Sequence, residues 1–180
     1  QITAEYEPLP VMTTARQALK KDAALIHENL DTYKHVPSLN PVSETNICHH
    51  YRLRKGNAED ILSKASNVFE DEFEFPHMSQ AALEPHGAVA IWSKSDELTV
   101  WSSCKSPHLV RHQLAELFEM PLSKVRVIAP LIGGGFGGKS DFTIEPLIAF
   151  LAREVKGRYL RLVLTREEVF TGAVIARGCQ

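Results

Sequence analysis

The stretch KVRVIAPLIGGGFGGKSDFTIEPLIAFLAREV, residues 124–155, holds the features that decide the fold. The apolar run 124–130 predicts a strand. The apolar run 145–155 predicts a helix that begins at Glu145, because a proline such as Pro146 fits without a steric clash only in the first turn of a helix. Five glycines around one phenylalanine connect the two elements. The order of strand, glycine-rich loop and helix raises the question of what the loop binds.

The loop satisfies two phosphate-binding sequence patterns. Residues 133–140, GGGFGGKS, match both G-x-x-x-x-G-K-[ST] and G-x-G-x-x-G. A P-loop needs a helix that begins at Lys139–Ser140, and Pro146 would then lie in the helix interior at a cost of about 3 kcal/mol. A dinucleotide site needs an acidic residue after the next strand, where Thr165 and Arg166 stand instead. A nucleotide-phosphate-binding α/β domain, with Arg166 as an NADP-type contact, is therefore the weaker alternative.

The same residues also suit a different ligand. Glycines let the backbone approach a ligand closely and present its amides, which makes a nest for an anionic or oxo group. At the tip of the loop, the Phe136 side chain is expected to line a pocket rather than to pack in the hydrophobic core. The alternative without a ligand is a glycine-rich turn that only allows two elements to pack closely.

The segments around the loop predict an α+β fold in two layers. In chain order the expected elements are strands at 87–92 and 97–101, a helix at 106–118, a strand at 124–130, a helix at 145–155, a strand at 159–164 and the start of a helix at 165–170. This ββ-α-β-α-β order predicts a mixed β-sheet covered by helices. On the helix at 106–118, which Ser106 caps, the side chains expected to face the core are Leu109, Leu114, Leu117 and Phe118.

Residues 1–46 are expected to be the end of a preceding domain plus a linker. Residues 2–10 predict a strand that prolines stop, 13–21 predict a short helix capped by Thr13 or Thr14, and 31–46 are rich in Pro, Ser and Asn. The chain has no initiator Met and stops just after a helix-like run, so both ends are expected to be cuts inside a longer polypeptide.

Two more elements are expected between the linker and the sheet. Residues 56–65 predict a helix capped by Asn57. In residues 67–75, Phe69, Phe73 and Phe75 alternate with acidic residues, which predicts a half-buried strand.

The composition excludes several classes of partner. The 180 residues are 44% hydrophobic and 23% charged, as in ordinary globular proteins. Twenty Lys+Arg against 22 Asp+Glu give a net charge of −2, so no strong field recruits nucleic acid or an anionic membrane. No run of eighteen apolar residues is present, so no membrane span is predicted. Three scattered cysteines without a CxxC pair favour a reduced, cytoplasmic chain.

No metal-ligand set is expected from the histidines. Cys48-His49-His50 are adjacent residues, which point in different directions, and no second cluster lies at zinc-like spacing. His108 and His112 have the spacing of a helical zinc pair, but the accompanying Glu is absent.

Four stretches together resemble one known family. GGGFGGK, preceded by VRVIAPLI, is similar to the signature of the large, molybdenum-binding part of the xanthine dehydrogenase/aldehyde oxidase family, the molybdenum hydroxylases. The stretches AEYEPLPVMTTARQAL at 4–19, ALEPHGAVAIW at 82–92 and VWSSCKSPHLVR at 100–111 agree with it in sequence and spacing. The resemblance covers nearly the whole chain, and residues 47–180 would then be a truncated molybdopterin-binding subdomain.

The resemblance implies a set of cofactors and partners. These are molybdopterin with molybdenum, in bacteria usually as the cytosine dinucleotide, and a reaction that hydroxylates an N-heterocycle or aldehyde with oxygen from water. Electrons in such enzymes leave through 2Fe-2S clusters and FAD on partner domains or subunits. This chain would hold one wall of the cofactor site and be inactive alone. The alternative is a non-catalytic, stand-alone binding module. Exposed apolar surface near the C-terminus and some homodimerisation are also expected.

The resemblance also implies which residues form the site. The backbone of Gly135, Phe136 and Gly137 and the ring of Phe136 would lie beside the molybdenum ligands. The conformation of the loop would depend on Gly133, Gly134 and Gly138. The segment 102–108 matches a family loop, S-T-Q-x-P-H, whose Gln donates a hydrogen bond to a metal-bound oxygen. Here Lys105 stands in place of that Gln, and Cys104 in place of the Thr. Cys104 is either a reactive thiolate beside Lys105 or a small buried residue.

Two residues are expected close to the substrate. Ser140 stands where purine-hydroxylating members carry a Glu, which weakens the case for a purine. Glu84 belongs to Glu84–Pro85–His86, a turn into the next strand that family members keep close to the cofactor channel. The general base and the substrate-clamping Arg of the family lie beyond residue 180, so no catalytic residue is expected within the chain.

Overall fold

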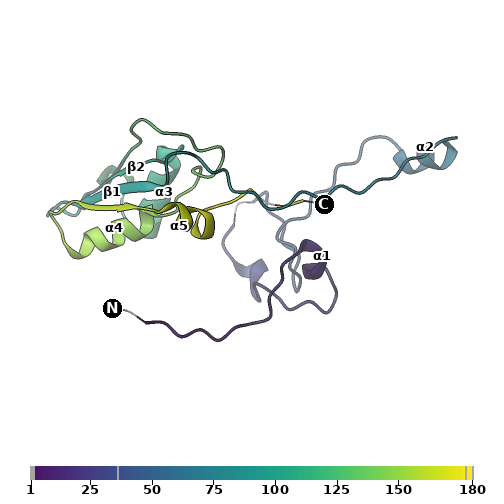
Figure 1. Ribbon diagram of the computed structural model, residues 1–180, viewed down its shortest axis with the longest axis horizontal. Coiled ribbons are helices and arrows are strands. Elements are labelled where there is room, and N and C mark those ends of the chain that lie inside the picture. Colours follow the sequence, from purple (N-terminus) through teal and green to yellow (C-terminus); the bar gives the residue numbers. More distant parts are fainter. Residues whose placement is uncertain (1–2, 36, 177, 180) are drawn as a thin grey trace. The chain divides into compact units, whose positions relative to one another are not determined.

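The computed structural model describes residues 3–35, 37–176 and 178–179. The chain divides into two compact units, Gln1–Glu72 and Phe73–Gln180. The first unit contains the short helices α1 (Ala15–Ala18), η1 (Leu30–Thr32) and α2 (Ala58–Lys64) (Figure 1). Thr14 and Asn57 cap α1 and α2 with their side chains, as predicted. The predicted start of the cofactor-binding subdomain at residue 47 stays a prediction.

The second unit is built on a four-stranded mixed sheet. Its elements in chain order are β1 (Gly87–Trp92), β2 (Leu98–Ser102), α3 (Pro107–Leu117), η2 (Leu122–Lys124), β3 (Val125–Ile128), α4 (Glu145–Glu154), β4 (Leu160–Val163) and α5 (Arg166–Gly172). The strand order is β3-β2-β1-β4, with β1 antiparallel to both neighbours and β2 parallel to β3. The predicted α+β fold and its ββ-α-β-α-β order are confirmed.

Helices α3 and α4 pack against the sheet and against each other (Figure 1). The core between them and the sheet includes Ala90, Trp92, Val100, Leu114 and Ala149. The indole Nε1 of Trp92 donates a hydrogen bond of 2.7 Å to the Ala149 carbonyl, so the only polar atom of this buried ring is satisfied.

The buried face of α3 differs from the prediction. Val110, Leu114 and Ala115 are buried, whereas Leu109 and Leu117 are 44% and 53% exposed. The prediction is confirmed for Leu114 and for Phe118, which is partly buried against the core, but it is wrong for Leu109 and Leu117. The structure buries residues four positions apart, which share one side of a helix, so the smaller Val110 lies in the core in their place.

The opposite face of the sheet carries no helix among the described residues. Paired residues on this face are Val89 with Trp101 and Val89 with Arg161, and Val163 continues it on β4. The Trp101 ring lies 5.9 Å from that of Tyr159, measured between centroids. A groove of about 320 Å3 on this face reaches Glu84.

Two predicted strands are absent from the described residues. Residues 3–10 form no strand, and residues 67–75 contribute only an isolated bridge between Phe75 and Cys179. Phe69 is 90% exposed and Phe73 is 70% exposed, so alternation with acidic residues produced no buried face there. A strand needs a continuous neighbour to satisfy its backbone, and among the described residues only Phe75 in these two segments has a bridge partner.

Candidate functional site

The glycine loop, residues 133–138, follows β3 and makes a tight backbone turn. The Gly138 N–H donates to the Gly135 carbonyl at 2.8 Å. Gly134 and Gly137 have φ of 95° and 93°, and Phe136 between them has φ of 49°. Gly134 and Gly137 adopt these values without strain, whereas the left-handed conformation is uncommon for a residue such as Phe136. The Phe136 ring is 77% exposed and therefore stands outside the core.

The loop has the properties of a cradle for an anionic or oxo group. Among the described residues, the N–H groups of Gly135, Phe136 and Gly137 donate to no protein acceptor. A Cβ added at Gly137 would meet nothing within 4 Å. Free amides beside open space, without side chains to block them, can approach a ligand closely.

Glu84 holds the first end of the loop. Its Oε2 accepts hydrogen bonds from the Gly133 N–H at 2.9 Å and from the Lys139 ammonium at 2.6 Å. Its own N–H donates to the Gly133 carbonyl at 3.3 Å. Burial acts to raise the pKa of Glu84, but the hydrogen bonds from Lys139 and Gly133 outweigh it and lower the pKa below its ordinary value.

Lys139 has a buried partner that sequence reasoning did not identify. Its side chain is only 2% exposed, and the carboxylate of Glu84 neutralises its charge. The pattern at 133–140 assigned this lysine to a phosphate, and no signal in the sequence connects it to a glutamate 55 positions earlier.

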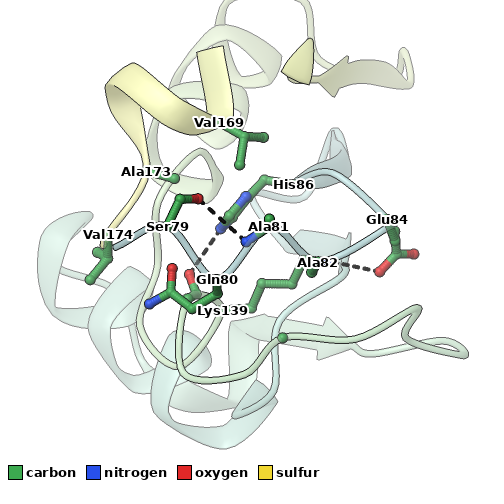
Figure 2. Close-up of a pocket in the computed structure, with 12 residues that line it drawn as sticks. Ser79, Gln80, Ala81, Ala82, Glu84, His86, Lys139, Val169, Ala173 and Val174 are labelled. Carbon is green, nitrogen blue, oxygen red and sulfur yellow. Dashed lines mark hydrogen bonds and ion pairs between the residues drawn. The ribbon is translucent and has the colours of Figure 1, made fainter. Parts of the chain in front are cut away.

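His86 holds the other end of the loop. Its Nε2 lies 2.9 Å from the Gly138 carbonyl oxygen. A carbonyl can only accept, so Nε2 carries the proton. The ring is buried, and its Nδ1 has no partner among the described residues. Figure 2 shows His86 and Lys139 on the wall of a cavity of about 10 Å3, room for about one water molecule.

The segment 103–106 lies against the end of the glycine loop. The Lys105 N–H donates to the Lys139 carbonyl at 2.8 Å, and the Lys105 side chain is exposed. Cys104 is 2% exposed and belongs to the core. Burial raises the pKa of its thiol, and the nearby Glu145 carboxylate adds to the effect despite a hydrogen bond to Ser102. Of the two predicted alternatives for Cys104, the small buried residue is therefore the one that the structure supports.

Glu145 is a second residue that sequence reasoning did not single out. It is 4% exposed, and its carboxylate accepts hydrogen bonds from the Ser102 hydroxyl and from the N–H groups of Thr143 and Ile144. It thereby joins the end of β2 to the start of α4. An acidic residue beside a proline at a helix start is the signal that could have indicated it. Ser140 is half-buried and lies between the loop and this helix.

The loop does not have the geometry that the nucleotide-phosphate alternative requires. The helix begins at Glu145, as predicted, and not at Lys139–Ser140, so no helix N-terminus faces the loop at the P-loop position. Lys139 is buried against Glu84 and does not reach outward. Arg166, the candidate NADP contact, donates instead to the carbonyls of Ala82 and Leu83 at 2.7 and 2.9 Å.

The described residues contain neither a cluster of metal ligands nor a membrane-spanning helix. No group of three or more His, Cys, Asp or Glu side chains is placed to hold a metal ion there. None of the helices in that part of the chain has the length and hydropathy needed to cross a bilayer.

The chain matches the family model of the molybdopterin cofactor-binding domain over residues 39–179. It is 31% identical to the xanthine dehydrogenase molybdenum-binding subunit of Escherichia coli O157:H7, over 94% of this chain and 20% of that subunit. Carbon monoxide dehydrogenase from Oligotropha carboxidovorans superposes with a TM-score of 0.79 at 30% identity, over 96% of this chain and 22% of the other. Quinoline 2-oxidoreductase from Pseudomonas putida 86 gives 0.76 at 29% identity, over 96% and 20%.

The length of these relatives sets the scope of the match. The chain spans about a fifth of the xanthine dehydrogenase subunit and of the two solved chains. Aldehyde oxidoreductase molybdenum-binding subunits and carbon monoxide dehydrogenase large chains also match it. The chain belongs to the molybdopterin cofactor-binding domain family found in the large subunits of xanthine dehydrogenases, aldehyde oxidoreductases and carbon monoxide dehydrogenases.

Proposed function

We propose that the glycine loop binds the molybdenum end of a molybdopterin cofactor, in its cytosine dinucleotide form, as one wall of a larger site. The observation that carries the proposal is the set of consecutive free amides at Gly135, Phe136 and Gly137, with open space around the Cβ position of Gly137. Amides in this arrangement suit an oxo or anionic group. Membership of the molybdopterin-binding family supports this ligand over a nucleotide phosphate.

The residues around the loop have distinct roles in the proposed site. Gly133, Gly134 and Gly138 set the shape of the turn, and the exposed Phe136 ring forms a wall against the ligand. Lys105 presents an exposed ammonium from the adjoining segment and donates to an oxygen of the bound group. Ser140 and Glu84 are proposed to lie near the substrate.

The proposed reaction of the longer protein is hydroxylation of an N-heterocycle or aldehyde. In this reaction a C–H group and one water molecule are converted to a C–OH group, and two protons and two electrons are released. The molybdenum group, when bound, supplies the oxygen from water and accepts the electron pair. The electrons then pass to 2Fe-2S clusters and FAD on partner domains or subunits. In this scheme the 180 residues position the group, and the proton-accepting residue comes from elsewhere.

A titration followed by NMR tests the binding proposal. The 15N-labelled 180-residue chain is titrated with isolated molybdopterin, with and without molybdate, and separately with ATP. We expect chemical-shift changes confined to residues 133–140 and Lys105 on adding molybdopterin. The matched variant Gly135→Ala keeps the fold, because its new Cβ lies at an ordinary 3.6 Å from Lys139, and should lower the affinity at least about tenfold.

Each outcome of the titration decides the proposal. Shifts elsewhere in the chain, or the same affinity in Gly135→Ala, would contradict it. Shifts of the loop with ATP and not with molybdopterin would favour a phosphate ligand.

A further inference from the structure

We propose that Glu84 and His86 are positioning residues that clamp the two ends of the glycine loop and hold it ready for its ligand. Both residues belong to the segment Glu84–Pro85–His86, which we call the clamp. The contacts within the clamp are independent of any ligand, but its relevance to cofactor binding rests on the function proposed above.

The first contact holds the start of the loop. Glu84 and Gly133 exchange two hydrogen bonds, from the Gly133 N–H to the carboxylate and from the Glu84 N–H to the Gly133 carbonyl. The two backbones are also close, because a Cβ at Gly133 would lie 2.6 Å from the Glu84 Cβ. A side chain at Gly133 would therefore displace the carboxylate.

The second contact holds the end of the loop. His86 donates from Nε2 to the Gly138 carbonyl, and Glu84 pairs with Lys139, the next residue (Figure 2). The lysine is buried, so removing its partner would leave a desolvated charge. One three-residue segment thus holds both Gly133 and Gly138, and the residues between them are left to face the ligand.

The clamp is itself attached to the rest of the domain. His86 directly precedes β1, one of the two inner strands of the sheet. Arg166, at the start of α5, donates to the carbonyls of Ala82 and Leu83 just before the clamp. A loop held in this way loses less conformational freedom when it binds, and preorganised amides bind charge more strongly.

The test uses the cofactor-free 180-residue chain and NMR. Amide hydrogen exchange at Gly133 reports the Glu84 contact, and the carbonyl 13C shift of Gly138 reports the His86 contact. We expect Glu84→Ala to speed exchange at Gly133 about tenfold to a hundredfold. We expect His86→Leu to shift the Gly138 carbonyl and His86→Gln, whose amide can donate from a similar position, to restore it.

A charge test separates positioning from mere loss of structure. Glu84→Gln keeps an acceptor for Gly133 but leaves the Lys139 ammonium unpaired, so it should lower the melting temperature. Adding Lys139→Met should recover much of that loss, since both charges are then gone. Glu154→Gln, an exposed carboxylate at the end of α4, is the matched control and should change none of these signals.

The outcomes also separate the clamp from the proposed function. Unchanged exchange at Gly133 in Glu84→Ala, or a His86 proton found on Nδ1, would overturn the clamp whatever the loop binds. If the variants do not fold, the wild-type tautomer and the hydrogen-bond coupling from His86 Nε2 to the Gly138 carbonyl decide the matter. A confirmed clamp together with no molybdopterin binding would overturn only the proposed function.

Discussion

Replacing Gly133 and Gly135 by alanine, one at a time, tests whether a close contact with a neighbouring residue requires glycine at either position of the glycine loop. Neither glycine has a positive φ, so alanine introduces no backbone strain of that kind at either position. At Gly133 the added Cβ would lie 2.6 Å from the Glu84 Cβ, which is 0.8 Å (3.4 − 2.6) inside the range of ordinary contacts. At Gly135 the nearest atom is the Lys139 Cβ, at 3.6 Å.

The expected magnitudes follow from these contacts. The Glu84 Cβ is bonded to the backbone, so it moves only if the chain moves, and overpacking of this kind costs about 1–3 kcal/mol. For a domain of roughly 100 residues this lowers the melting temperature by roughly 4–15 °C. Gly135→Ala should stay within about 1 kcal/mol of wild type, because it also reduces the freedom of the unfolded chain.

Thermal unfolding of both variants, followed by circular dichroism, measures the difference. Hydrogen exchange at Gly133 shows whether the lost stability comes from the contact with Glu84. Equal melting temperatures for the two variants would refute the argument from the 2.6 Å contact. A larger loss in Gly135→Ala would show that the loop has another shape.

Four further predictions test the rest of the domain. Leu114→Ala removes a fully buried side chain and should cost about 2–5 kcal/mol by chemical denaturation, whereas the exposed Leu117→Ala should stay within about 0.5 kcal/mol. Cys104 is buried with a raised pKa, so iodoacetamide at neutral pH should label it at least about tenfold more slowly than the exposed Cys48, as peptide mass spectrometry can show. Thr165→Ala removes the capping box of α5 and should cost about 0.5–2 kcal/mol in a thermal melt. The pKa of Glu84 is lowered in the folded state, so the stability that its carboxylate contributes should be complete above its ordinary pKa of 4.5 and should be lost as the pH falls through the lower folded value. Thermal melts between about pH 3 and 6 should show this pH dependence in the wild type and not in Glu84→Ala.

The starts of the helices could be predicted because their signals are local. Pro146 restricts where a helix can begin, and the start at Glu145 follows from that one residue. The capping residues Thr14, Asn57 and Thr165 act within one turn of helix. Such features depend on neighbours three or four positions away, which the sequence displays directly.

The partners across the domain could not be predicted in the same way. Glu84 and Lys139 are 55 positions apart, and their meeting depends on the sheet order, in which β2 pairs with both β1 and β3. The alternation at 67–75 predicted a strand, but Phe69 and Phe73 have no neighbouring strand to pack against and remain exposed. A periodic pattern shows which face could be buried and does not supply the surface that buries it.

The central position of β1 affects the order in which the domain can assemble during synthesis. Its antiparallel partner β4 begins at Leu160, about 70 residues after β1 ends at Trp92. At a translation speed of about 5–20 residues per second, one edge of β1 waits roughly 4–14 s for its partner. During that interval the ribosome-bound chain presents an unpaired strand edge with apolar residues on it, which is the kind of surface that chaperones recognise.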